Sequence, residues 1–407
     1  MSHPDQVVVQ EKPDRRIVVA ALGVTQILAW GSTFYLLGVL ANPIARDTGW
    51  GYDWVISGVS VGLLTAGAVS PRVGRAIGKW GGRRVLALSA VLLAGGLLLL
   101  GTSQSIAWYL TAWLLIGAGM GSGLTDAAFS TLGSIYGEDA RSPITSLTLF
   151  AGFASTLCWP LSAYLVERLG WRGACFIYAA IQIGVALPIL LLALPGRSFI
   201  APSTDHEGAR SRASLAPGEL PIFGLLAVVL TLSAAILSML GIHLLPLLQA
   251  RGLELSAAVG LGAIVGPSQV GARVVEMLAG RHYHPIWTMV GSAALVAIGT
   301  GLLFADFPVY SVAIVLYGAG NGIGSVARGT LPLVLFGSSR YPILMGRLAL
   351  SILMSMALSP FLGAIAFQVG GANSTLGLIA FLGAANVLLV GLLWTLSRRR
   401  PTQVEID

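Results

Sequence analysis

The chain has 407 residues and a net charge of +7, and apolar residues dominate its composition. Hydrophobic residues make up 55% of it and charged residues only 10%, with a mean hydropathy of +0.82. A soluble domain is about a quarter charged, so this chain lacks the polar side chains for a surface that faces water throughout. The composition therefore excludes an ordinary soluble protein and indicates a surface that faces lipid.

The excess of positive charge does not indicate a nucleic-acid-binding protein. The arginines lie in short loops between apolar runs, and no basic stripe with interleaved aromatic residues is present. The two cysteines, Cys158 and Cys175, lie inside apolar segments and offer neither a disulfide framework nor metal-ligand spacing. We find no nucleophile–base pair and no Walker-type phosphate loop. We therefore predict no enzyme activity, no cofactor, no metal and no nucleic-acid partner.

Long apolar runs follow one another along the whole chain. The first run follows Arg15 and Arg16 and is too long for the core of a signal peptide. A membrane-spanning helix needs about 20 mostly apolar residues. On that basis we predict six spans in the first part, near 17–40, 52–71, 84–102, 106–134, 144–166 and 173–195. Six more follow, near 219–248, 255–278, 286–304, 309–333, 342–367 and 375–395.

One long polar stretch, 196–218, interrupts the series and divides the predicted spans six and six. We therefore predict an all-α membrane protein with twelve transmembrane helices in two six-helix bundles. Residues 1–195 form the first bundle and residues 219–407 form the second, which ends in a short basic tail. Residues 196–218 are predicted to be a cytoplasmic linker.

The distribution of Lys and Arg predicts the orientation of the chain. Seventeen of these residues lie in predicted loops on the side of the N-terminus. The opposite loops hold only four, which are Arg46, Arg168, Arg172 and Arg251. Because positive charge is retained on the cytoplasmic side, both termini are predicted to be cytoplasmic. The short loops favour the plasma membrane of a bacterium, its inner membrane, as the location.

A glycine-rich basic segment after the second predicted span carries a family resemblance. It reads GRAIGKWGGRRVL over residues 74–86, and a second feature, Leu169-Gly170-Trp171-Arg172, opens the sixth span. Together with the two six-span halves, these segments resemble the major facilitator transporters. The sequence departs from that family at Gly78, which stands where the family has an acidic residue. The resemblance implies a cavity lined by helices 1, 4, 7 and 10, with helices 2, 5, 8 and 11 beside it.

The first predicted hairpin carries a narrower resemblance. Its sequence, GSTFYLLGVLANPIARDTGW over residues 31–50, is similar to the start of the monocarboxylate and oxalate/formate branch. In that branch a polar or acidic residue lies four positions before an arginine linked to the substrate. Gln269 and Arg273 match this spacing, so the resemblance implies that both contact the substrate.

A charged residue at membrane depth costs about 2.5–3.5 kcal/mol on insertion scales, so five of those within the predicted spans are candidates for function. They are Asp126, Arg273, Glu276, Arg328 and Arg347. Their sum is one net positive charge, which favours an anionic substrate. Arg273 can hold a carboxylate with its planar guanidinium, or it can extend to the edge of the membrane. Arg328 and Arg347 are candidates for a gate that pairs with Glu276 or Asp126, and Asp126 either titrates or remains the partner of an arginine.

Polar and aromatic residues within the spans complete the candidate site. Candidate substrate contacts are Gln26, Trp30 and Tyr35 on helix 1 and Asn321 on helix 10, although such residues often bond neighbouring helices instead. His243 on helix 7 is a candidate proton carrier.

Our leading hypothesis for function is a monomeric secondary transporter that moves a small organic anion by alternating access, with a proton as a possible coupling ion. The alternative is an exporter of a larger metabolite or drug by proton antiport on the same fold.

Overall fold

The computed structural model describes residues 13–196, 215–216 and 218–398, and these residues form helices and turns without a strand. The helices of the first part are α1 (Arg15–Gly31), α2 (Leu37–Thr48), α3 (Tyr52–Trp80), α4 (Gly82–Gly101), α5 (Ile106–Gly123), α6 (Thr125–Tyr136), α7 (Arg141–Ala151), α8 (Ala154–Ile181) and α9 (Leu187–Ala193). Those of the second part are α11 (Leu220–Ala250), α12 (Leu255–Ala279), α13 (Pro285–Phe304), α14 (Tyr310–Phe336) and α15 (Tyr341–Arg398). Short helices η1 (Gly137–Ala140), η2 (Gln182–Ala186, a π-helix) and η3 (Gly280–His282) join some of them.

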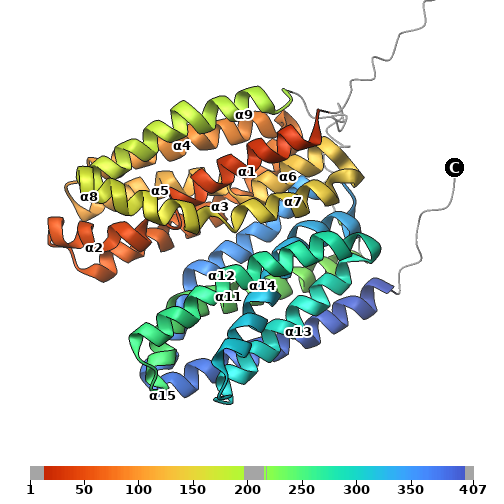
Figure 1. Ribbon diagram of the computed structural model, residues 1–407. Coiled ribbons are helices and arrows are strands. Elements are labelled where there is room, and N and C mark those ends of the chain that lie inside the picture. Colours follow the sequence, from red (N-terminus) through yellow and green to blue (C-terminus); the bar gives the residue numbers. More distant parts are fainter. Residues whose placement is uncertain (1–12, 197–214, 217, 399–407) are drawn as a thin grey trace, which may run out of the picture.

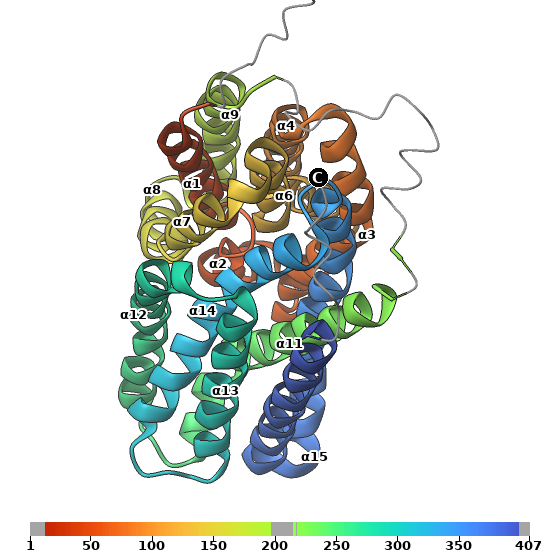
Figure 2. The same ribbon diagram turned by 90° about the vertical axis from the view of Figure 1, so that its right-hand side faces the viewer.

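The helices form two groups, as Figure 1 shows. Helices α1 to α9 make up the first group and α11 to α15 the second, and in Figure 2 most of the first group lies above the second. Most of the predicted linker, together with residues 1–12 and the basic tail from 399, lies outside the described residues.

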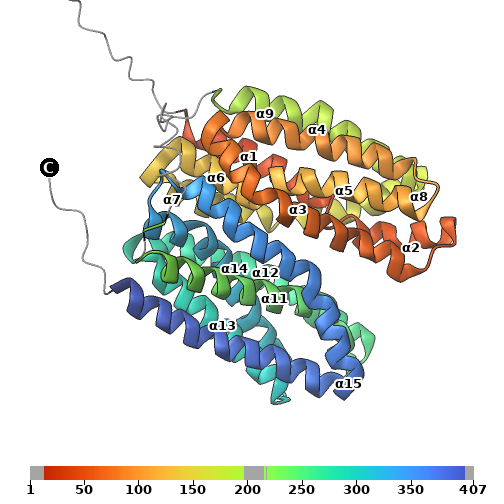
Figure 3. The ribbon, with the colours of Figure 1, turned by 180° about the vertical axis from the view of Figure 1, so that it is seen from behind.

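Two of the long helices reverse direction at glycines. α8 turns at Gly170, whose φ is +70°, and α15 turns at Gly370 and Gly371, where Gly371 has a φ of +66°. Only glycine adopts a positive φ without a steric penalty, so these residues allow a turn with almost no loop. Figure 3 shows the chain of α15 folding back on itself beyond this point. The two turns agree with the predicted ends of spans at 166 and 367.

Three predicted spans are interrupted rather than continuous. The span at 17–40 breaks between α1 and α2, because Ser32 and Thr33 bond back to carbonyls of the preceding turn. The span at 106–134 breaks at Leu124, whose extended backbone (ψ −169°) follows a glycine-rich segment. The span at 144–166 breaks between α7 and α8. The predicted span at 52–71 is too short, because α3 continues to Trp80 and turns at Gly81 (φ +81°).

The two groups contact each other toward one end, where α1 and α15 both begin. α3 packs against α15 with backbones nearly touching: a Cβ at Gly346 would lie 2.5 Å from the Ser70 carbonyl oxygen. Gly74, the first residue of the basic segment, faces Pro342 equally closely, so its role is packing rather than a turn. Figure 1 shows the groups diverging away from this contact. We call the contacting end the closed end and the other the open end.

Seven helical segments among the described residues are long and apolar enough to cross a membrane. They are Tyr52–Trp80, Gly82–Gly101, Thr156–Ala193, Leu220–Ala250, Leu255–Ala279, Pro285–Phe304 and Tyr341–Arg398. Two of these segments contain the glycine reversals described above. The fold is therefore that of a multi-pass helical membrane protein.

Candidate functional site

Arg273 lies where the two groups meet. It extends from α12 and is only 7% exposed. Its guanidinium donates to the carbonyl of Thr148 on α7 at 3.0 Å, across the boundary between the groups. It also donates to Ser325 Oγ at 3.0 Å and to the Gly322 carbonyl at 3.3 Å, both on α14. The residue thus joins three helices from both groups.

Every hydrogen-bond partner of Arg273 within the described residues is neutral. The predicted neighbour Gln269 accepts from it through Oε1, at 3.4 Å. Gly152, directly after α7, leaves room for the guanidinium, since a Cβ there would lie 3.1 Å from Nη1. A buried cation is stable only when hydrogen bonds and an opposite charge offset its desolvation. Two carbonyls, a hydroxyl and an amide supply the hydrogen bonds here, and no carboxylate among the described residues forms an ion pair with Arg273.

Four aromatic rings form a contiguous group, and we call it the aromatic wall: Trp30, Phe34, Tyr35 and Trp159. Tyr35 is central, with ring centroids 6.2 Å from Trp30, 5.4 Å from Phe34 and 6.1 Å from Trp159. Tyr35 also interacts electrostatically with Arg273. The break between α1 and α2 places Phe34 and Tyr35 in a turn and so turns them toward the boundary. The sequence singled out Trp30 and Tyr35 but missed the other two rings.

Asp126 and Arg328 form an ion pair between the two groups. Asp126 lies in the first turn of α6, and Arg328 extends from α14. Arg328 Nε donates to Oδ1 at 3.1 Å and Nη2 to Oδ2 at 2.5 Å, a two-pronged geometry typical of Arg–carboxylate pairs. The side chains are 13% and 23% exposed, respectively. Of the two partners considered for Arg328, the structure selects Asp126.

A small cavity lies against this ion pair. Its lining includes Trp30 of the aromatic wall and Met356 of α15, so both groups of helices contribute to it. Trp30 Nε1 donates to Thr125 Oγ1 at 3.1 Å, which ties the wall to the break in the fourth predicted span. Gln26 donates to the Gly123 carbonyl at 2.6 Å just before the same break. Gln26 therefore stabilises the broken helix, and its side chain is only 3% exposed.

Glu276 lies in a separate polar cluster at the closed end. It accepts hydrogen bonds from the hydroxyls of Tyr283, at 2.5 Å, and Thr288, at 2.7 Å. Burial and the hydrogen bond to Glu276 raise the pKa of Tyr283 to about 12. Arg141 of α7 donates to the carbonyls of Gly280 and, at 2.8 Å, Tyr283, and so joins the two groups. Sequence reasoning treated Arg141 only as a loop charge.

Within the described residues, we find no hydrogen bond from the remaining predicted residues to Arg273 or to the aromatic wall. His243 of α11 contacts the Pro360 carbonyl of α15 through Nε2 at 2.9 Å. Asn321 interacts with Tyr317 one turn earlier on α14, and its Nδ2 has no partner among the described residues. Arg347 lies on an exposed face of α15.

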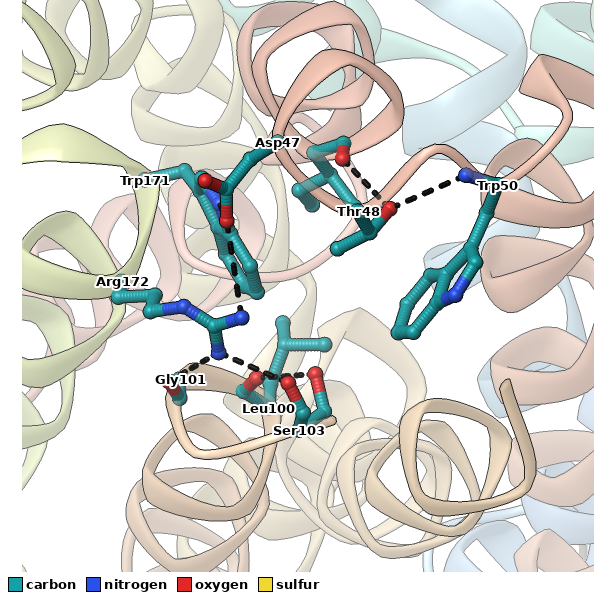
Figure 4. A network of polar contacts seen from close by, with 9 residues as sticks. Asp47, Thr48, Trp50, Leu100, Gly101, Ser103, Trp171 and Arg172 are labelled. Atoms are coloured by element: carbon teal, nitrogen blue, oxygen red, sulfur yellow. Dashed lines mark hydrogen bonds and ion pairs between the residues drawn. The ribbon is translucent and has the colours of Figure 1, made fainter. Parts of the chain in front are cut away.

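A further polar network, which the sequence did not predict, stabilises the open end of the first group. Figure 4 shows Arg172 extending from the second part of α8 toward the C-terminal end of α4. It donates to the carbonyls of Gly101 at 3.0 Å and Ser103 at 2.8 Å, and it lies 3.6 Å from Asp47. Trp171 Nε1 donates to the same carboxylate at 2.9 Å. A cation at a helix C-terminus also interacts favourably with the helix dipole.

The fold and the arrangement of these residues define a class, that of helical membrane transporters built from two groups of helices, rather than an enzyme. The family model of the Major Facilitator Superfamily matches residues 22–283, and the chain belongs to this superfamily. The comparison with curated proteins gives no match.

Several solved structures are similar in fold. The human organic anion transporter MFSD10 (TETRAN) is 16% identical, with a TM-score of 0.70 over 93% of this chain and 100% of that one. FucP, a Major Facilitator Superfamily transporter in the outward conformation, is 13% identical, with a TM-score of 0.73 over 92% and 98%. A second structure of FucP, the fucose:proton symporter of E. coli, is 14% identical, with a TM-score of 0.70 over 93% and 99%. At these identities the likeness establishes the fold alone.

Proposed function

We propose that this protein is a secondary transporter that moves a small organic anion by alternating access. Twelve crossings follow if each interrupted helix counts as one span and the reversals at Gly170 and Gly370 each separate two. Residues 1–195 and 219–407 are then the two six-helix bundles, joined by the linker at 196–218. The proposed orientation has both termini in the cytoplasm of a bacterium, with the protein in the inner membrane.

The observation that carries this proposal is the chemistry around Arg273. The side chain is buried at the meeting of both groups, and within the described residues its hydrogen-bond partners are all uncharged. A carboxylate can accept two parallel hydrogen bonds from a guanidinium and would supply the missing opposite charge. The human organic anion transporter MFSD10 shares this fold, so the fold is compatible with an organic anion as substrate.

The Asp126–Arg328 pair supports alternating access with a coupled proton. It bridges α6 and α14, so it must break when the closed end opens. Protonation of Asp126 would remove the charge that holds Arg328, and that step couples proton binding to opening. FucP, whose fold this chain shares, is a proton symporter. With the N-terminus in the cytoplasm, the closed end faces the cytoplasm and the open end faces outward.

The test is uptake of labelled carboxylates into proteoliposomes, with and without a pH gradient. We expect uptake of at least one monocarboxylate, stimulated by an inward proton gradient. Arg273→Gln should abolish it, whereas Arg168→Gln, a change at an exposed arginine of α8, should leave it intact. Transport of hydrophobic cations or neutral metabolites, with no carboxylate moved, would refute the proposal. That result would favour the alternative function, an exporter of a larger metabolite or drug.

A further inference from the structure

The charges near the boundary of the two groups limit the charge of the substrate. Asp126 and Arg328 neutralise each other. Glu276 is held by two hydroxyls in the closed-end cluster, near Arg141. Arg273 is then the single buried cation at this boundary whose partners among the described residues are all neutral. One negative charge offsets it, whereas a second would be buried without a partner at considerable cost.

The aromatic wall indicates the chemical nature of the uncharged part of the substrate, which we call its body. Trp30, Phe34 and Tyr35 are half-buried, and Trp159 is 49% exposed, so the rings retain accessible surface. The Trp30–Phe34, Phe34–Tyr35 and Tyr35–Trp159 pairs all meet edge to face. A flat ring can extend such a cluster by stacking or by an edge-to-face contact, and each contact contributes roughly 0.5–1.5 kcal/mol beyond the buried area.

The side-chain oxygens of Ser325 and Gln269 beside Arg273 already accept hydrogen bonds from it, which leaves fewer free acceptors for the hydroxyls of a polyhydroxylated substrate. Ser325 Oγ accepts from Arg273 and donates to the Gly322 carbonyl. Gln269 Oε1 accepts from Arg273, and Thr125 Oγ1 accepts from Trp30. In contrast, we find no hydrogen bond from the Tyr35 hydroxyl to any described residue. Tyr35 therefore belongs to the aromatic wall and can also donate to a carboxylate held by Arg273.

We propose that the substrate is a monocarboxylate with an aromatic body, its carboxylate at Arg273 and its ring against the aromatic wall. This inference rests on the proposed function and specifies the substrate class of the same site. Tyr35 joins the two halves of the site, because it contacts Trp30 and Trp159 and interacts with Arg273.

The test is equilibrium binding to the purified protein by isothermal titration calorimetry, which avoids the passive entry of weak acids into liposomes. The ligands are benzoate, cyclohexanecarboxylate, acetate and phthalate. We expect benzoate to bind at least tenfold more tightly than acetate, with cyclohexanecarboxylate weaker than benzoate and no measurable binding of the dianion phthalate. Equal affinities for benzoate and acetate, or for benzoate and cyclohexanecarboxylate, would refute the aromatic body. Preference for phthalate would refute the single charge.

Two variants and a control separate this inference from the proposed function. Trp30→Leu should weaken benzoate about tenfold and leave acetate unchanged, whereas Arg273→Gln should abolish binding of both. Trp80→Leu, at an exposed ring at the end of α3, should alter neither. An unchanged benzoate affinity in Trp30→Leu would overturn the inference and leave the anion transporter standing. Failure of every carboxylate to bind would overturn both.

Discussion

Replacement of Asp126 by Asn is predicted to destabilise the closed end. At about 3 Å and an effective dielectric constant of about 20, the attraction between Asp126 and Arg328 is about 5 kcal/mol, part of which offsets the desolvation of both groups. Asn keeps one acceptor but removes the charge, so we expect a net loss of about 2 kcal/mol. Because the pair joins α6 to α14, this loss falls on the closed conformation alone. The population with the closed end open should rise about 30-fold.

Distance measurements between labels at the closed end test this prediction. Spin labels at Glu138→Cys in η1 and Ser339→Cys before α15 lie on exposed residues of different groups. Pulsed dipolar spectroscopy should show a longer distance population in Asp126→Asn. Asp47→Asn is the matched control, because its 3.6 Å ion pair with Arg172 is exposed and lies within one group. An unchanged distance distribution in Asp126→Asn would refute the reasoning that the pair holds the groups together.

Two further predictions concern Arg273 and the closed end. Gly152→Ala places a Cβ 2.8 Å from Val270 Cγ2 and 3.1 Å from Arg273 Nη1, so carboxylate affinity measured by calorimetry should fall about tenfold. Gly266→Ala, with no atom within 4 Å of its Cβ, is the control, and equal affinities in the two variants would contradict the packing argument. Burial and then Arg141 lower the pKa of His284, so the folded state favours the neutral ring that accepts from the Ile286 N–H. The melting temperature should therefore fall as the pH drops below 6.5. His284→Asn retains a helix cap but does not titrate, so its melting temperature should depend less on pH. Parallel curves of melting temperature against pH for the two proteins would contradict this role of His284.

The sequence allowed much of the fold to be predicted, because lipid imposes a simple rule on it. Backbone groups within a bilayer must bond internally, so long apolar runs become helices. The reversals at Gly170 and Gly370 fall where spans were predicted to end. The interruptions at Ser32 and Leu124 were missed, since hydropathy remains high through them and the break depends on local hydrogen bonds.

For the candidate site, residue type indicated the chemistry but could not assign the partners. A charge within an apolar run is costly, and this alone marked Asp126, Arg273 and Arg328 as important. Which carboxylate faces Arg328 depends on how α6 approaches α14 across some 200 positions of chain, and hydropathy carries no information on that approach. Arg141 was overlooked for the same reason, since its acceptors are the backbone carbonyls of Gly280 and Tyr283, about 140 positions further along the chain.

Sequence alone thus determined that the chain is helical, lies in a membrane and carries one net positive charge over the five charged residues singled out within its predicted spans. Apolar length and the cost of burying charge are local properties, and both can be read from consecutive residues. Only the tertiary structure decided that Asp126 neutralises Arg328 and that Arg273 is left with neutral partners beside four aromatic rings. Ion pairing and aromatic contact act over a few ångströms, and the folded packing of the two groups sets those distances.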